Sequence, residues 1–262
     1  MAVQTKEIVS LYGGLITVPA VELPTEDGEP LESSWHRSEI NLLIESLRVH
    51  WRGRQDYYAG GNMFIYFMLE QAHRPIFRGP DFFVALDVDG SYSRGAWVVW
   101  LERGKYPDVI VELLSPSTAY EDLTTKKDLY EKIFRTPEYF CYNPYVHEFR
   151  GWRLKDMTYE EIKPDERGWF WSKRLGLWLG LWKGRYLEED GIWLRFYDTD
   201  GELVPTFGEL EQKRAEQERQ RAEQERQRAE RAEAELAQLR ERLQKQGIRN
   251  AECEIRNPKS EI

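Results

Sequence analysis

A glutamate interrupts an apolar run near the middle of the chain. Residues 109–114 read Val-Ile-Val-Glu-Leu-Leu, a composition typical of a strand that is buried on both faces. An ionised carboxylate without a partner in such a strand costs several kcal/mol. Glu112 therefore needs a cation, a metal ion or hydrogen bonds, and it is the first candidate for chemistry.

A lysine is available on the helix that is predicted after this strand. Thr118 and Glu121 fit a capping box, and apolar residues then recur at helical spacing. At about 100° per residue, Lys126 falls near the centre of the apolar stripe and Lys127 at its margin. Lys126 can form a structural ion pair with Glu112, extend its charged end to solvent while its stem packs, or take part in catalysis.

A second carboxylate stands at the start of an earlier strand. Residues 78–86 read Arg-Gly-Pro-Asp-Phe-Phe-Val-Ala-Leu, a turn followed by a strand that opens with Asp81. A Pro-Asp pair alone is ordinary turn chemistry. Together with Glu112, however, Asp81 can hold Mg²⁺, which keeps several of its waters. A lysine beside them can orient the attacking water and neutralise charge that develops on a phosphate.

The order of these residues resembles the Uma-two (Uma2) family of restriction endonucleases in the PD-(D/E)XK nuclease superfamily. The shared features are the Pro-Asp pair, the strand that runs into Glu-Leu-Leu-Ser-Pro-Ser-Thr, and Asp122, Lys126 and Tyr130 at four-residue steps. The resemblance covers roughly residues 35–203. It implies a core sheet flanked by helices, Mg²⁺-dependent cleavage of DNA, and a role for Tyr130 in positioning the lysine.

The resemblance also implies the composition of the active site. Asp81 and Glu112 would hold Mg²⁺, aided by the backbone carbonyl of Leu113. The superfamily pattern places a lysine two residues after the glutamate, where this chain has Leu114. The family is similar in this respect, and its lysine is expected on the following helix, which here means Lys126. The implied catalytic residues are therefore Asp81, Glu112 and Lys126.

The chain is predicted to fold as α+β (mixed α/β), with a restriction-endonuclease-like sheet and a long C-terminal helix. Residues 1–33 form an N-terminal arm and linker, and the nuclease-like domain covers residues 34–205. Its first helix begins near Ser34 and places His36 on the apolar side, where it can support the site or be a satisfied core histidine. Strands are predicted at residues 56–59, 63–69, 81–88, 96–101, 109–114 and 139–142.

Tryptophan is abundant between residues 148 and 197, where short strands are predicted as an extension of the sheet. These residues can form part of the core or stack on sugars or bases. The six are Trp152, Trp169, Trp171, Trp178, Trp182 and Trp193.

Residues 206–247 have the composition of a charged helix. They consist almost entirely of Glu, Gln, Arg, Ala and Leu, and a seven-residue motif is repeated. A heptad frame is apolar only near its end, at Leu236, Leu239 and Leu243. The segment can be a solvated helix or a coiled coil that makes a homodimer. Residues 248–262 are predicted to be a disordered tail.

Composition limits the function classes. The net charge is −9, which argues against a surface coated for non-specific binding of nucleic acid. Arginines at positions 48, 52, 54, 74 and 78 can be a solvated face or a local basic groove. Two cysteines make neither a disulfide framework nor a zinc site. No signal peptide and no apolar run of bilayer length is present, so a cytoplasmic protein without a membrane partner is expected.

Two function classes are therefore open. In the first, the protein is an Mg²⁺-dependent endonuclease whose substrate is DNA. In the second, a nuclease fold without catalytic activity serves as a scaffold, and the C-terminal helix recruits a partner. The acidic charge and Leu114 favour the scaffold, whereas the presence of Asp81, Glu112 and Lys126 in a consistent order favours the enzyme. A sugar-binding module, suggested only by the tryptophans, is a third and weaker alternative.

Overall fold

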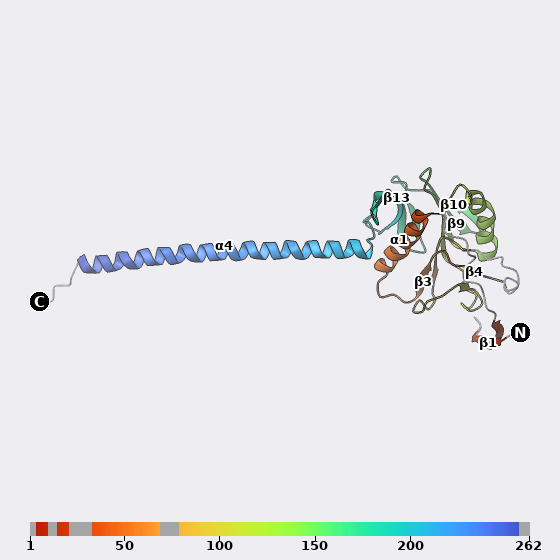
Figure 1. The fold of residues 1–262 in the computed structure, drawn as a ribbon, viewed down its shortest axis with the longest axis horizontal. Coiled ribbons are helices and arrows are strands. Elements are labelled where there is room, and N and C mark those ends of the chain that lie inside the picture. The colour runs from red at the N-terminus through yellow and green to blue at the C-terminus, as the bar shows by residue number, and fades with distance from the viewer. Residues whose placement is uncertain (1–3, 10–14, 21–32, 69–78, 257–262) are drawn as a thin grey trace. The chain divides into compact units, whose positions relative to one another are not determined.

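The structure is a computed structural model, and it describes residues 4–9, 15–20, 33–68 and 79–256 (Figure 1). The chain divides into two compact units, Met1–Phe207 and Gly208–Ile262. The linker predicted for residues 22–32 lies outside the described residues, as do Arg74 and Arg78.

A six-stranded mixed sheet forms the centre of the first unit, with the strand order β10-β9-β8-β7-β5-β3. β7 and β8 run parallel, and the other neighbours are antiparallel. Every residue of β5 and β7 is buried, as expected for Val-, Ile- and Phe-rich strands with both faces covered. The strands are β3 (Tyr57–Gly60), β5 (Phe82–Leu86), β7 (Val109–Leu113), β8 (Glu138–Asn143), β9 (Glu148–Lys155) and β10 (Thr158–Glu161).

Helix α1 (Ser34–His50) and a second sheet share one core with one face of the central sheet. Ile40, Leu43 and Leu47 of α1 lie in this core. The second sheet is antiparallel and contains β11 (Phe170–Ser172), β12 (Leu177–Tyr186) and β13 (Glu189–Tyr197). Alternation along β12 and β13 sends Leu177, Leu179, Leu194 and Phe196 into the same core.

The opposite face of the central sheet packs against the helical run that follows β7. Tyr130 and Phe134 of this run share a core with Ile110 and Leu114. The run is not one uniform helix, because it alternates between short α-helical and π-helical turns. These are α2 (Ala119–Glu121), η2 (Asp122–Lys126), α3 (Lys127–Leu129) and η3 (Tyr130–Phe134).

The start of the helical run differs from the predicted capping box. Thr118 has a helical backbone with φ −105° and ψ −18°, and its side chain makes no capping hydrogen bond. A capping residue has an extended backbone instead. The hydroxyl of Thr118 lies 3.0 Å from that of Ser115, so Thr118 stabilises the loop before the helix. The capping-box prediction is therefore wrong.

Two small sheets complete the strands. β1 (Gln4–Val9) and β2 (Leu15–Ala20) form an antiparallel pair within the segment that the sequence predicts as an N-terminal arm. β4 (Ile65–Tyr66) and β6 (Trp97–Val98) pair in parallel, so the strands predicted over residues 63–69 and 96–101 are much shorter than expected. Together with the central sheet and the helices, these small sheets make the predicted α+β fold.

The tryptophans of the extension are packing residues. Trp193 is fully buried and Trp152 is 4% exposed, while Trp169, Trp171, Trp178 and Trp182 are half-buried. Trp152 stacks on Tyr139 with ring centroids 5.7 Å apart. Since none of the six is exposed, the structure gives the stacking hypothesis no support.

The second unit contains most of helix α4 (Phe207–Arg256). The helix includes residues 248–256, for which the sequence predicts disorder, and residues 257–262 lie outside the described part of the chain. Among the described helices, α4 included, none combines the length and the apolar character needed to cross a bilayer.

Candidate active site

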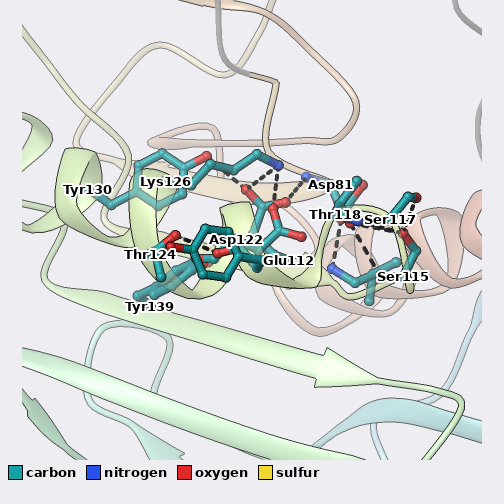
Figure 2. Close-up of polar contacts among 12 residues, drawn as sticks. Asp81, Glu112, Ser115, Ser117, Thr118, Asp122, Thr124, Lys126, Tyr130 and Tyr139 are labelled. Carbon is teal, nitrogen blue, oxygen red and sulfur yellow. Dashed lines mark hydrogen bonds and ion pairs between the residues drawn. The ribbon is translucent and has the colours of Figure 1, made fainter.

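Asp81 and Glu112 lie opposite each other on neighbouring antiparallel strands. The register pairs Phe82 with Val111, so Asp81, one residue before β5, falls beside Glu112. Two hydrogen bonds connect the strands at this point (Figure 2). The backbone N–H of Asp81 donates to Oε2 of Glu112 over 3.2 Å, and the N–H of Leu113 donates to Oδ2 of Asp81 over 2.7 Å. Each carboxylate is therefore held by an amide of the other strand.

Lys126 joins this pair from the helical run, in the orientation predicted from the apolar stripe. Its Nζ lies 3.3 Å from Oε1 of Glu112 and 2.7 Å from Oδ1 of Asp122. Tyr130 donates its hydroxyl to Oε1 of Glu112 over 2.8 Å, and Figure 2 shows these side chains converging. The side chains of Glu112 and Asp122 are 0% and 1% exposed, and that of Lys126 is 15% exposed. One lysine thus lies among buried carboxylates.

The π-helical turns bring Asp122, Lys126 and Tyr130 into line. In a regular α-helix, residues four apart overshoot a full turn by about 40°. A π-helical turn contains more residues, since its hydrogen bonds join residues five apart. The run inserts such turns at residues 122–126 and 130–134, which reduces the overshoot. All three side chains therefore reach the same point above β7.

Burial dominates the electrostatics of the carboxylates. Desolvation raises the pKa of Glu112 to about 7, and the positive charge of Lys126 only partly opposes this shift. Desolvation also raises the pKa of Asp81 and that of Asp122 to about 6. Burial alone would lower the pKa of Lys126, but Glu112, Asp122 and Asp81 together raise it above its ordinary value. The lysine stays charged, while the carboxylates lack enough positive charge around them.

His36 reaches the site through the backbone. Its Nε2 lies 3.0 Å from the carbonyl oxygen of Leu113. Because a carbonyl only accepts, Nε2 is the donor, and in the neutral ring Nδ1 accepts from the hydroxyl of Ser33 over 3.0 Å. Ser33 also caps α1 by accepting the backbone N–H of His36. His36 is 4% exposed, so it is both a core residue and a neighbour of the strand end that carries Glu112.

The Ser-Pro-Ser-Thr loop fixes the connection between β7 and the helical run. The hydroxyl of Ser115 lies 2.9 Å from that of Ser117 and 3.0 Å from that of Thr118 (Figure 2). Further along, the hydroxyl of Tyr139 donates to the backbone carbonyl of Asp122 over 2.8 Å. These bonds hold the helical run at both the loop and the sheet, so the position of Lys126 is fixed relative to Glu112.

A glycine allows the backbone to approach Asp81 closely. A Cβ atom added at Gly61 would lie 2.4 Å from the carbonyl oxygen of Asp81 and 2.3 Å from Cγ2 of Ile40. The next residue, Asn62, donates its N–H to the carbonyls of Pro80 and Asp81. A larger residue at position 61 would push the aspartate out of place.

Asp122 was not among the residues predicted for the site from the sequence, although it belongs to the motif of four-residue steps. Its place one helical turn before Lys126, at an apolar face, is the signal that could have identified it. The structure brings together all the predicted residues, namely Asp81, Glu112, Leu113, Lys126, Tyr130 and His36, and adds Asp122.

The oxygen donors suit a hard divalent cation. Among the described residues, no group of three or more His, Cys, Asp or Glu side chains is arranged to hold a metal ion. Mg²⁺ needs only one or two carboxylates, because it keeps several waters. Asp81, Glu112 and the carbonyl of Leu113 provide oxygens of this type. The raised pKa values of Asp81 and Glu112 also indicate uncompensated negative charge. The residues therefore fit Mg²⁺.

Comparison with known proteins identifies the family. The model of the Uma2 family, described as "Putative restriction endonuclease", matches residues 19–188. The solved structures that match this chain include a "putative nuclease belonging to DUF820" from Anabaena variabilis, whose sequence is 15% identical to that of this chain. That match covers 54% of this chain and 76% of the other chain, with a TM-score of 0.38. No curated protein matches. Since the family model covers more than half of the chain, the protein belongs to the Uma2 family in the restriction endonuclease-like superfamily.

Proposed function

We propose that the protein is an Mg²⁺-dependent DNA endonuclease whose catalytic residues are Asp81, Glu112 and Lys126. One observation carries the proposal. A single lysine lies beside two buried carboxylates, Glu112 and Asp122, and near the half-buried Asp81, and the pKa values of all three carboxylates are raised to about 6 or 7. Perturbed groups of this kind cluster at functional sites. Membership of a family described as restriction endonucleases supports DNA as the substrate.

Asp81, Glu112 and the carbonyl of Leu113 would hold the ion. When bound, Mg²⁺ polarises a phosphoryl oxygen and lowers the pKa of a coordinated water. Asp81 and Glu112 must be ionised for this role, and each accepts an amide hydrogen bond that fixes its orientation. His36 donates to the carbonyl of Leu113, and because a carbonyl oxygen has two lone pairs it can accept this bond and still bind an ion.

Lys126 acts as a fixed positive charge in this proposal. Its pKa is raised by the surrounding carboxylates, so it does not lose a proton readily and is a poor general base. An ammonium group near the scissile phosphate donates hydrogen bonds to the attacking water and stabilises charge on the phosphoryl oxygens. Asp122 and Tyr130 position it, because Asp122 binds its Nζ and Tyr130 holds its partner Glu112.

A scaffold without catalytic activity is the second candidate, and one observation favours it. Lys126 already makes ion pairs with Glu112 and Asp122, an arrangement that also suits a purely structural role. In that case the cluster would fix the helical run on the sheet and bind no metal ion.

Plasmid cleavage separates the two candidates. Purified wild-type protein is incubated with supercoiled DNA and Mg²⁺, in parallel with Asp81→Asn and Glu112→Gln. The control is Asp128→Asn, which removes an exposed carboxylate from the same helical run. We expect nicking by the wild type and the control, none with EDTA, and none by the two site variants, whose folding is checked by circular dichroism. Cleavage by Glu112→Gln at the wild-type rate would overturn the proposal.

A further inference from the structure

Three leucines near the end of α4 are exposed on one side of the helix. Leu236, Leu239 and Leu243 have 54%, 54% and 61% of their surface exposed. They alternate at spacings of three and four residues, and Ala229 and Ala232 precede them in the same frame. This spacing is that of the two core positions of a coiled coil. Before Ala229 the frame places Glu218 and Glu225 in the core positions, so the apolar seam begins only after residue 225.

The charged residues that flank this seam are unpaired within the helix. Arg228 and Glu235 flank it on one side, and Glu233 and Arg240 on the other. Among the described residues none of these four makes an ion pair, whereas other charged residues of α4 do so along the helix, for example Lys245 with Glu241 and Arg226 with Glu223. All four side chains are exposed.

A second copy of the same helix would satisfy all four. In a parallel, in-register pair, each residue on the Arg228 and Glu235 side of one helix faces the residue five positions later in sequence, which lies on the other flank of the partner helix. Arg228 then faces Glu233, and Glu235 faces Arg240, each pair being formed twice by symmetry. The same rule sets Arg221 against Arg226 further upstream, which is repulsive. Charge and apolarity therefore agree on where the pairing begins.

We propose that α4 forms a parallel two-stranded coiled coil with a second copy of this chain over residues 228–243. An antiparallel pair that aligns Leu236 with Leu239 also pairs Glu235 with Arg242 and Glu233 with Arg240. It leaves Arg228 without an opposite charge among the described residues, whereas the parallel pair sets Arg242 against Gly247. The two arrangements make the same number of opposite-charge pairs, and the cross-linking experiment below distinguishes them. The chain's two units are connected at the start of α4, so both Met1–Phe207 units emerge at the same end. If the proposed function holds, the particle carries two nuclease sites.

Charge reversal in full-length protein tests the pairing. One variant is Glu233→Arg with Glu235→Arg, and the other is Arg228→Glu with Arg240→Glu. A homodimer of either variant has like charges at all four flanking positions of both helices. A heterodimer of the two variants, formed in an equal mixture, has opposite charges at each of the pairs 228–233 and 235–240. Analytical ultracentrifugation should show dimers for the wild type, at least about tenfold weaker association for each variant, and dimers for the mixture. Glu223→Arg with Glu230→Arg, at outward positions, should dimerise like the wild type.

Disulfide cross-linking tests the orientation. In a Cys253→Ser background, Ala232→Cys lies at a core position and should form a cross-linked dimer on mild oxidation. Gln238→Cys, at an outward position, is the matched control and should not. A monomeric wild type at up to about 1 mM, the weak end of specific association, would overturn the proposal. So would a dimer that Ala232→Cys fails to cross-link. Neither measurement involves DNA or metal, so both are independent of the nuclease assay.

Discussion

Two aspartate–lysine pairs with the same spacing lie on the helical run after β7, in very different surroundings. Asp122 and Lys126 are four residues apart with 2.7 Å between their charged atoms, and so are Asp128 and Lys132. The side chains of the second pair are 62% and 61% exposed. Those of the first pair are 1% and 15% exposed, and the buried carboxylate of Glu112 lies beside them.

The difference shows that burial, and not sequence spacing, decides how strongly a charged pair affects stability and the pKa values of its groups. An exposed pair contributes about 0–1 kcal/mol to stability, because water screens it. At the buried pair, desolvation raises the pKa of Asp122 to about 6 and that of neighbouring Glu112 to about 7. The same helical run therefore contains one buried cluster with raised carboxylate pKa values where it meets the sheet, and an ordinary solvated pair further along the chain.

The largest difference between the two pairs should appear in DNA cleavage, when the lysine of each pair is replaced in turn. We expect Lys126→Met to lower the rate of Mg²⁺-dependent DNA cleavage by about 10²–10³-fold, because it removes a preorganised charge from the phosphate. Lys132→Met should cleave at the wild-type rate. Single-turnover assays on plasmid DNA measure both. Equal losses in the two variants would remove the distinction between the pairs.

The same variants should differ in stability. Lys126→Met leaves buried carboxylates without their counter-ion and should lower the free energy of unfolding by about 3–5 kcal/mol at pH 8. Lys132→Met should change it by less than about 1 kcal/mol. Urea unfolding followed by tryptophan fluorescence provides the values. At pH 5 the cost of Lys126→Met should shrink, since the carboxylates are then protonated. A cost that does not depend on pH would argue against charge as its cause.

The pH dependence of the metal-free protein follows from Glu112. Its pKa is 4.5 in the unfolded chain and about 7 in the fold, so between these values the folded state holds more protons. The contribution of Glu112 to stability is complete below about pH 4.5 and is lost as the pH rises through about 7. With EDTA present, Glu112→Gln should therefore be more stable than the wild type at pH 8, on the order of 3 kcal/mol. A variant less stable than the wild type at pH 8 would contradict the raised pKa.

The smallest effect should come from removing α4. The described side chains from Glu211 to Gln246 are all exposed, so the helix buries little apolar surface within one chain. A chain that ends at Phe207 should unfold thermally within a few degrees of the full-length protein when both are monomeric. Differential scanning calorimetry at low concentration measures this. A large drop in Tm would show that the first unit depends on the helix.

Two residues of the candidate site could be predicted because each one contradicts its local pattern. Glu112 lies in an apolar strand, and Lys126 lies in an apolar stripe, so both are visible in the sequence. Asp122 was not placed in the site from the sequence, because it entered the prediction only as the first residue of the motif with four-residue steps. The sequence also could not reveal the π-helical turns, because apolar periodicity does not distinguish 3.6 residues per turn from a slightly wider helix.

The fold shows the same limits. Four strands of the central sheet, β3, β5, β7 and β8, follow from apolar runs, and α1 follows from its stripe. β4 and β6 are two residues long each, and the apolar runs around them predict longer strands. Thr118 fits a capping box in sequence, but its hydroxyl bonds to Ser115 instead. In these places tertiary contacts override local preference.

Calorimetric titration of Mg²⁺ into the metal-free protein at pH 7 tests the central claim most directly. Wild-type protein should bind Mg²⁺ and release protons, because binding ionises carboxylates whose pKa values are raised. The measured heat should therefore depend on the ionisation enthalpy of the buffer. Glu112→Gln should bind no Mg²⁺, while Asp128→Asn should bind like the wild type. No binding by the wild type, or equal binding by Glu112→Gln, would contradict the assignment of Asp81 and Glu112 as a metal site.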